Sequence, residues 1–248
     1  MNLKGKTILV TGASSGIGQA IAIAVAQKGA TAVIAYRKNK EGAEHTLKEV
    51  EKYGVGHVVQ ADLSDQPQVE SMFKHISEKI GSVDMLVNNA GHAQPSDFFD
   101  NEQWRNQFAN IFFSALNVSQ QFLKHVKNDA VQKIINITSI YGNLNTGNNE
   151  FFAYSAAKAA LSSLTVTLAK RDSNILVNAI APGYVWTPAW EGISDAEKKL
   201  CESKTMIGRF IMPEEIAHMA VAILENDAIT GQVVTVDGGL SLQKLERK

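Results

Sequence analysis

The sequence has little of what holds small secreted domains or metal clusters together, because its 248 residues include a single cysteine, Cys201. One cysteine excludes an intrachain disulfide and a thiolate metal cluster, and it favours a reducing compartment. An excess of charge is also missing, since 24 lysines and arginines balance 25 acidic residues. Such a balance offers no general attraction to nucleic acid or to an anionic membrane surface.

Long hydrophobic runs are absent too. The apolar run near the start stops at Val10, which is too short for a signal peptide. No stretch approaches the roughly 18 apolar residues of a membrane span. No repeat, low-complexity segment or flexible linker divides the chain. We therefore expect one domain over residues 1–248, soluble and cytoplasmic, with neither nucleic acid nor a membrane as partner.

Short β-branched runs alternate with longer amphipathic stretches, which is typical of βαβ units around a parallel sheet. The runs predict strands over residues 7–10, 32–35, 57–59, 85–87, 134–137, 176–180 and 233–236. The stretches predict helices over residues 17–28, 42–52, 69–80, 101–126, 154–169 and 213–224. We predict an α/β fold of the Rossmann type, a doubly wound, seven-stranded parallel sheet with helices on both faces.

Three irregular stretches, residues 91–100, 142–152 and 182–212, follow predicted strands or the turns after them. Ligands of open α/β sheets bind beyond the carboxyl ends of the strands. The last two stretches are long enough to favour function over mere connection. We expect all three to lie at the rim where a ligand binds.

A glycine-rich turn, Thr11-Gly12-Ala13-Ser14-Ser15-Gly16-Ile17-Gly18, follows the first strand and precedes a helix. Gly12 permits a tight turn, Gly16 lets the backbone approach a pyrophosphate, and Gly18 allows close packing of helix on sheet. The helix N-terminus adds unpaired N–H groups and a positive dipole. The turn predicts a dinucleotide site, although its spacing differs from the commoner G-x-G-x-x-G pattern.

The same turn matches the G-x-S-x-G spacing of a hydrolase nucleophile elbow through Gly12, Ser14 and Gly16. A serine hydrolase at Ser14 would need a later acidic residue and then a histidine, and His218 is the only late histidine. His218 falls within a predicted helix, and the elbow gives no reason for Gly18. The hydrolase and an ordinary structural turn remain the alternatives.

Tyr36, Arg37 and Lys38 lie at the end of the second strand, about 20 residues beyond the glycine turn, where the adenosine ribose of a dinucleotide is recognised. An acidic side chain there would accept from a ribose 2′-hydroxyl, whereas guanidinium and ammonium groups fit a 2′-phosphate. The three residues favour NADP(H) over NAD(H). A solvated basic loop is the alternative.

Tyr154 and Lys158 are four residues apart at the start of a predicted helix, so both lie on one face. An ammonium beside the phenol would lower the pKa of Tyr154 from about 10 toward the working range of an acid–base catalyst. Alone, the pair is typical of many helix surfaces, so it needs support from other motifs.

Supporting motifs stand along the chain. Asn88-Asn89-Ala90-Gly91 follows the fourth strand, Asn110 lies in the long helical stretch, Ser139 follows the fifth strand, and Pro182-Gly183-Tyr184-Val185-Trp186-Thr187 ends the sixth. With these motifs the sequence resembles the classical short-chain dehydrogenase/reductase family and is similar to its 3-oxoacyl-carrier-protein reductases. The resemblance runs from Lys6 to Gly239, which is nearly the whole chain.

The resemblance implies four catalytic residues. Tyr154 would protonate the substrate oxygen during reduction, and Ser139 would hold and polarise the carbonyl. Lys158 would tune Tyr154 and bind the nicotinamide ribose, while Asn110 would anchor a water that connects Lys158 to solvent. Hydride chemistry of this kind needs no metal, and no histidine pair has metal-ligand spacing.

The cofactor candidates form five groups along the chain. They are Gly12, Ser14, Ser15, Gly16, Ile17 and Gly18 at the phosphates, Tyr36, Arg37 and Lys38 at the adenosine ribose, Asp62 and Leu63 beside the adenine, Asn88, Ala90 and Gly91 along the middle, and Tyr154, Lys158, Pro182, Gly183, Val185 and Thr187 at the nicotinamide end.

The expected activity is NADP(H)-dependent transfer of a hydride between nicotinamide and a carbonyl or secondary alcohol of a small molecule. A 3-oxoacyl thioester is one candidate substrate. A catalytically idle nucleotide-binding or structural protein on the same fold is the alternative. The resemblance also implies a homotetramer or dimer through the predicted helices 101–126 and 154–169.

Two segments are expected to shape the substrate site and the chain end. Residues 186–212, which include Trp190, Met206, Ile207, Phe210 and Ile211, suggest a mobile lid. Residues 240–248 form a tail. The spacing between Ser139 and Tyr154 is longer than usual in the family, and the extra length in residues 143–150 makes the substrate hard to infer.

Overall fold

Seven parallel strands run through the middle of the computed structural model, in the order β3-β2-β1-β4-β5-β6-β7. The structure describes residues 1–125, 131–143, 146–171 and 173–242. The strands are β1 (Thr7–Thr11), β2 (Thr31–Tyr36), β3 (Gly56–Gln60), β4 (Met85–Asn88), β5 (Gln132–Ile137), β6 (Ile175–Pro182) and β7 (Val233–Val236). All seven predicted strands are confirmed, and the order reverses between β1 and β4, where ligands of such sheets bind.

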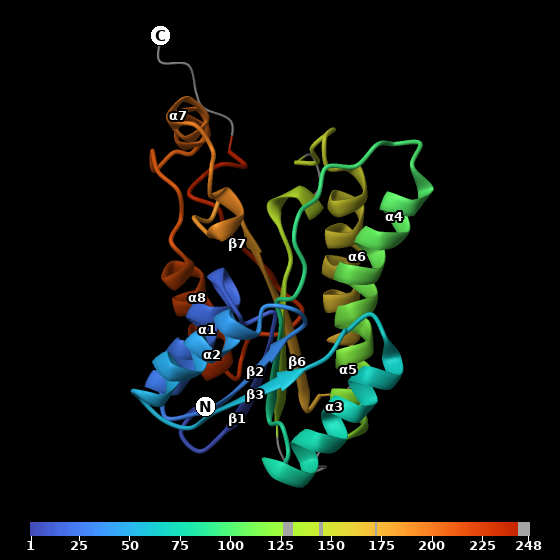
Figure 1. The fold of residues 1–248 in the computed structure, drawn as a ribbon, viewed down its shortest axis with the longest axis vertical. Helices are drawn as coiled ribbons and strands as arrows, with labels where there is room; N and C mark the ends of the chain where they lie inside the picture. The colour runs from blue at the N-terminus through green and yellow to red at the C-terminus, as the bar shows by residue number, and fades with distance from the viewer. Residues whose placement is uncertain (126–130, 144–145, 172, 243–248) are drawn as a thin grey trace.

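Helices cover both faces of this sheet (Figure 1). One layer consists of α1 (Gly16–Gln27), α2 (Lys40–Glu51) and α8 (Pro213–Glu225), and the other of α3 (Gln66–Lys79), α4 (Asn101–Phe108), α5 (Ser114–Lys124) and α6 (Phe152–Leu168). Successive residues of β1 alternate between the layers, since Ile8 and Val10 join one apolar cluster and Leu9 the other. The two clusters share one sheet, so the described chain is a single domain of the predicted Rossmann type.

Polar caps fix where several helices begin. The side chain of Asn39 accepts from the Gly42 N–H at the start of α2, and Asp65 accepts from the Gln68 N–H at the start of α3. Asp100 accepts from two N–H groups at the start of α4. Each cap accepts from backbone N–H groups that have no partner within the helix. It therefore marks where the loop after the preceding strand ends and the helix begins.

The prediction of one uninterrupted α-helix over residues 101–126 is wrong. A π turn, Ala109–Phe113, separates α4 from α5, and Val126 lies outside the described residues. Asn110 Nδ2 donates to the Asn106 carbonyl at 2.8 Å, and Ser114 Oγ donates to the Asn110 carbonyl at 2.8 Å. Side chains that bond to carbonyls of the preceding turn compete with the regular ladder, which fits an interruption at this point.

The stretch 182–212, predicted to be irregular, contains a short 3₁₀ turn (Pro188–Trp190) and α7 (Asp195–Lys204). None of the α7 residues is buried, so no apolar periodicity marks the helix in the sequence. Ser194 and Glu197 form a capping box at its start. That Ser-x-x-Glu spacing is the signal that could have revealed it.

Two other expectations touch residues that the structure does not describe. Residues 144 and 145 of the 143–150 loop and residues 243–248 of the tail lie outside the described part of the chain. Among helices of the described residues, none combines the length and the apolar character needed to cross a membrane.

Candidate active site

Residues that follow six of the seven strands line two neighbouring cavities at the carboxyl end of the sheet. The first, called here the substrate cavity, has Ser139, Tyr154 and Lys158 in its wall. The second, called the nucleotide cavity, has Gly12, Arg37 and Asp62 in its wall. Gly91 lines both, so the two cavities adjoin at the end of β4.

The catalytic candidates of the substrate cavity come from two elements. Ser139 follows β5 and caps a 3₁₀ turn, where its Oγ accepts from the Tyr141 N–H at 3.2 Å. Tyr154 and Lys158 lie one turn apart on α6, and both line the cavity. The structure therefore brings together Ser139, Tyr154 and Lys158, as the sequence predicted.

Gly142 lets these two elements approach each other. A Cβ atom at position 142 would lie 2.6 Å from the Lys158 carbonyl carbon and 2.7 Å from the Ala159 nitrogen. Both neighbours are backbone atoms of α6, so they have little freedom to move aside. The absence of a side chain at Gly142 therefore keeps Ser139 beside the face of α6 that carries Tyr154 and Lys158.

Burial dominates the ionisation of Tyr154 and Lys158. It raises the pKa of Tyr154 to about 12, although a hydrogen bond with Ser139 opposes the rise. It lowers the pKa of Lys158 to about 8. The expectation that Lys158 lowers the pKa of Tyr154 is therefore wrong for this structure. The Lys158 ammonium lies 5.7 Å from the centre of the Tyr154 ring and donates to the Ile137 carbonyl at 2.7 Å.

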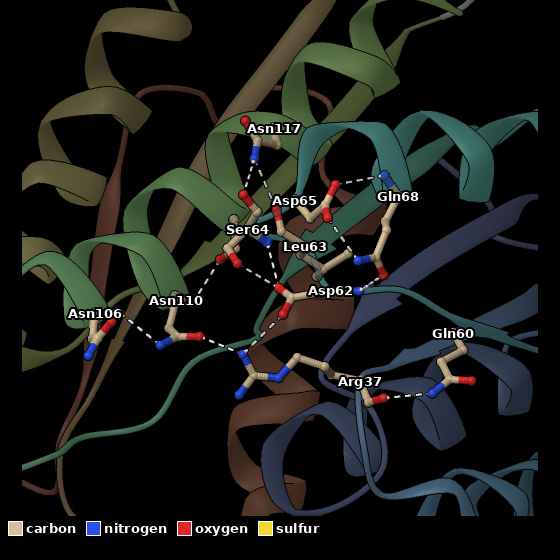
Figure 2. A network of polar contacts seen from close by, with 11 residues as sticks. Arg37, Gln60, Asp62, Leu63, Ser64, Asp65, Gln68, Asn106, Asn110 and Asn117 are labelled. Atoms are coloured by element: carbon tan, nitrogen blue, oxygen red, sulfur yellow. Dashed lines mark hydrogen bonds and ion pairs between the residues drawn. The ribbon is translucent and has the colours of Figure 1, made fainter.

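Asn110, the fourth catalytic candidate, lines the nucleotide cavity and not the substrate cavity. Its Oδ1 accepts from the Arg37 guanidinium at 2.7 Å, a contact that joins the π turn to the end of β2 (Figure 2). Its side-chain amide is thus bound to Arg37, at the predicted adenosine site.

Asp62 faces the same guanidinium, at 3.7 Å (Figure 2). Burial alone would raise the pKa of Asp62, but hydrogen bonds from Ser64 and the charge of Arg37 outweigh it and lower the pKa. Asn117 of α5 donates to the Leu63 carbonyl at 3.1 Å and steadies this loop. The nucleotide cavity therefore holds one guanidinium between a carboxylate and an amide, all partly open to solvent.

The glycine turn is packed against the end of β4. Asn89 Nδ2 donates to the carbonyls of Thr11 and Gly12 at 2.9 and 3.1 Å. A Cβ atom at Gly18 would lie 2.4 Å from that same Asn89 nitrogen and 2.5 Å from the Gly12 oxygen. Gly18 thus permits the close packing of helix on sheet that its place in the motif predicted.

The predicted cofactor residues fall into three sets in the structure. Those that line the substrate cavity are Ile17, Gly91, Tyr154, Lys158, Pro182, Gly183, Val185 and Thr187. Those that line the nucleotide cavity are Gly12, Arg37, Asp62, Leu63, Ala90 and Gly91. Those that line neither are Ser14, Ser15, Gly16, Gly18, Tyr36, Lys38 and Asn88.

Asn88 is engaged beneath the site. Its Nδ2 donates to Ser119 Oγ and to Asn136 Oδ1, both at 2.9 Å, and Asn136 donates in turn to Thr165 at 2.9 Å. This buried chain of polar groups links α5, β4, β5 and α6. Its bonds support the rim of the cavity from below.

The substrate cavity is also lined by residues to which the sequence assigned no role: Asn89, Ala93, Ile137, Thr138, Ile140, Tyr141, Phe151 and Tyr184. Trp190, which was predicted only as part of the lid, lines it too. The signal that could have revealed the aromatic ones was the number of aromatic residues in the segments that directly follow strands. Their pairing could not be read from the chain, because they come from segments far apart in sequence.

The other residues predicted to belong to the lid differ in burial. Phe210 and Ile211 are buried, whereas Met206 and Ile207 are about half exposed. The Met206 and Ile207 N–H groups donate to the Gly238 carbonyl, so this part of the segment is attached to the turn after β7.

The hydrolase alternative finds no support among the described residues. Ser14 lines neither cavity, and His218 lies exposed on α8. No group of three or more His, Cys, Asp or Glu side chains in the described part of the chain could hold a metal ion.

A doubly wound sheet whose rim carries a glycine turn and a Ser-Tyr-Lys set defines a class of nicotinamide-dependent oxidoreductases. The chain belongs to the short-chain dehydrogenase/reductase family, whose members act on CH–OH and C=O groups. The family model described as enoyl-(acyl carrier protein) reductase matches residues 12–241.

Among curated proteins, the chain is similar to a 3-oxoacyl-[acyl-carrier-protein] reductase FabG of Thermotoga maritima. The two are 34% identical over 97% of this chain and 99% of the relative. It is also 36% identical to the uncharacterized oxidoreductase YhdF of Bacillus subtilis, over 96% of this chain and 84% of that protein.

Two solved structures show the same architecture with a cofactor bound. The RhlG/NADP complex of Pseudomonas aeruginosa is 30% identical, with a TM-score of 0.89 over 97% of this chain and 98% of its own. An actinorhodin polyketide ketoreductase variant with NADPH is 29% identical, with a TM-score of 0.87 over 96% and 98%.

Proposed function

We propose that this oxidoreductase uses NADP(H) and works chiefly as a carbonyl reductase. The observation that carries the proposal is the junction of the two cavities: a Ser-Tyr-Lys set lines one, and a guanidinium on the β2 end lines the other. A dinucleotide that bridges them would bring its nicotinamide to Tyr154 and its adenosine end to Arg37.

The residues present fit such a cofactor. Gly12 and Gly18 let the turn pack closely against the end of β4, and the N-terminus of α1 that follows suits a pyrophosphate. Ile17, Val185 and Thr187 reach the substrate cavity from the other side of the turn. Arg37 supplies a cation for a 2′-phosphate, and Lys38 is exposed nearby. When bound, the cofactor supplies or accepts the hydride.

Tyr154 is suited to give a proton in the reductive direction. Because burial raises its pKa to about 12, the phenol keeps its proton at neutral pH and can donate it from Oη to the substrate oxygen. Ser139, hydrogen-bonded to Tyr154, would hold that same oxygen and polarise the carbonyl. Lys158 would replace its bond to Ile137 with contacts to the nicotinamide ribose.

Substrate and assembly follow as further parts of this proposal. The FabG relative suggests 3-oxoacyl thioesters as candidate substrates. A homo-oligomer through α4, α5 and α6 and a cytoplasmic location are carried over from the family resemblance. Asn110 keeps its proposed part in anchoring a water that connects Lys158 to solvent, and its side chain bonds to Arg37 in this structure.

The first experiment is a titration of the purified protein with NADPH and with NADH, followed by nicotinamide fluorescence. We expect NADPH to bind about 10- to 100-fold more tightly, because one charge-assisted contact contributes about 1.5–3 kcal/mol. Arg37→Ala should remove that difference, whereas Arg105→Ala, on the exposed face of α4, should leave it intact.

Equal affinity for the two cofactors in the wild type would contradict the preference for NADP(H). If neither cofactor binds, the glycine turn is not a working dinucleotide site, and the proposal of a catalytically idle structural protein becomes the better one.

A further inference from the structure

Aromatic rings form one wall of the substrate cavity beside the catalytic tyrosine. The ring of Tyr141 stacks on Phe151 with centres 6.3 Å apart and planes 26° apart. Phe151 meets Tyr154 edge to face, with centres 6.4 Å apart. All three rings line the cavity, so a substrate held at Tyr154 lies against an aromatic surface that continues from the reacting centre.

A second aromatic wall comes from the segment after β6. Tyr184 and Trp190 line the cavity with ring centres 5.5 Å apart. Phe210 supports them from behind, at 5.0 Å from Trp190 and 6.1 Å from Tyr184. Because Phe210 is buried, this wall is held in place by packing as well as by the chain.

The two walls meet where the hydroxyls of Tyr141 and Tyr184 lie 3.2 Å apart. The amide of Asn148 also donates to Tyr141 Oη, at 3.2 Å. Two hydroxyls carry two protons, and their mutual bond uses one. Within the described part of the chain the second proton is left over, whichever tyrosine donates. The pair therefore offers one O–H donor to a ligand.

The charge of the cavity lining and the volume of the cavity limit which ligands can bind there. Lys158 is the only cationic side chain among the described residues that line the cavity, and no carboxylate lines it. The cavity volume of about 220 Å³ is small, since ligand pockets usually span about 300–1,000 Å³. Part of it borders residues assigned to the nicotinamide. The remaining space suits a compact, neutral and flat molecule.

We propose that the protein reduces compact, neutral aryl or cyclic ketones that carry a second hydrogen-bond acceptor, and that the Tyr141–Tyr184 hydroxyl pair selects them by donating to that acceptor. This inference rests on the proposed reductase function and names its substrate class. The flat walls favour ring substrates through stacking and edge contacts. An open-chain thioester could accept from the spare donor through its thioester carbonyl, but it would not use the rings.

The test compares matched ketones with NADPH as reductant. The 2-, 3- and 4-methoxyacetophenones carry an ether oxygen, and the corresponding ethylacetophenones have nearly the same shape without an acceptor. For wild type, we expect kcat/KM to be about three- to tenfold higher for at least one methoxy isomer than for its ethyl partner, because this is the effect of one net hydrogen bond.

Variants assign that preference to the hydroxyl pair. In Tyr141→Phe/Tyr184→Phe the rings stay and both donors go, so the methoxy-to-ethyl ratio should fall to about one. Each single variant keeps one hydroxyl, and the one that loses the preference identifies the hydroxyl that faces the substrate. Tyr53→Phe, at a residue that is 52% exposed and lines neither cavity, is the matched control and should keep the wild-type ratio.

Contrary outcomes are separable. Equal rates for methoxy and ethyl ketones, or a preference that survives in the double variant, would refute the selective role of the pair. A higher kcat/KM for the N-acetylcysteamine thioester of acetoacetate than for every ring ketone would refute the substrate class, and the reductase function would stand. Tight NADPH binding with no ketone reduced would also refute the substrate class. Failure to bind NADPH at all would instead overturn the proposed function.

Discussion

The two cavities of this protein differ in how far their polar groups are exposed to solvent. In the nucleotide cavity Arg37, Asp62 and Asn110 carry the polar contacts, and the guanidinium and the carboxylate are each more than one-third exposed. In the substrate cavity Tyr154 and Lys158 are enclosed by aromatic and aliphatic groups, and both ionise far from their ordinary values.

The difference shows which process exposed charges suit and which process buried ionisable groups suit. Partly solvated charges exchange partners at little cost, which suits recognition of an anion that must bind and leave. Buried groups acquire altered pKa values, which suits proton transfer. Variants of one cavity should therefore change binding or turnover separately, and each prediction below tests that separation.

The largest effect is expected for Tyr154→Phe. The change removes the proton donor and keeps the ring, so kcat for ketone reduction should fall about 10²- to 10⁴-fold. The dissociation constant for NADPH should stay within about twofold of wild type, as measured by nicotinamide fluorescence. A comparable loss of NADPH affinity would show that the two cavities are not separable.

A second, smaller effect is expected for Gly142→Ala. The new Cβ would meet backbone atoms of α6 at 2.6 and 2.7 Å, so the turn that carries Ser139 must move away from Lys158. A shift of about 1 Å can lower turnover by up to about 100-fold, and the strain should reduce the free energy of unfolding by about 1–3 kcal/mol.

Gly147→Ala is the matched control, because no atom lies within 4 Å of a Cβ there. Turnover and thermal stability should stay at wild-type levels in that variant. Wild-type turnover in Gly142→Ala would show that the close approach of the turn to α6 is not needed for catalysis.

The pH dependence of kcat/KM tests the ionisation of Lys158. Burial lowers the pKa of Lys158 to about 8, so the ammonium predominates below that pH and the neutral amine above it. If catalysis needs the cation, kcat/KM should be level below pH 8 and fall about tenfold per unit above it. Lys158→Arg should move the fall to higher pH, and an unchanged fall would assign it to another group.

The smallest effect is expected for the ion pair between Arg209, in the segment before α8, and Glu215, in the first turn of α8. The carboxylate of Glu215 pairs with the Arg209 guanidinium at 2.7 Å, and this hydrogen bond, aided by one from the Met212 N–H, lowers the pKa of Glu215 to about 2. A depressed folded-state pKa stabilises the fold at pH values above the ordinary pKa near 4.5, and this contribution is lost as pH falls toward 2.

Glu215→Gln should remove this pH-dependent contribution. Because the two side chains are 50% and 39% exposed, the loss in unfolding free energy at pH 7 should stay below about 1 kcal/mol. Chemical denaturation at pH 7 and pH 3 measures it. A loss of similar size at both pH values would show that the pair does not act through ionisation.

The sequence predicted the sheet, and it placed most of the candidate site residues at the rim of that sheet, because both depend on local signals. Short β-branched runs mark buried strands, and motifs such as the glycine turn follow directly from them. Ser139, Tyr154 and Lys158 were found for the same reason, since each stands at a fixed place relative to a strand or a helix start.

What the sequence could not predict depends on contacts between distant segments. Helix α7 buries no side chain, so it lacked the apolar period that reveals the other helices. The π turn at Asn110 interrupts a stretch that looks continuous by residue type. The bond between Tyr141 and Tyr184 joins two loops 43 residues apart, and burial of Tyr154 reversed a pKa expectation based on helix spacing alone.

The buried amides beneath the site have a consequence for how the sheet assembles. Strands covered on both faces are apolar almost throughout, as in Met85, Leu86 and Val87, so hydrophobic pattern alone discriminates poorly between pairing offsets. Asn88 and Asn136 are direct partners across β4 and β5. A slip of one residue would turn one amide to the opposite face and leave both without partners, which carries a large desolvation penalty. These two side chains therefore fix the alignment of β4 with β5 beneath the candidate active site.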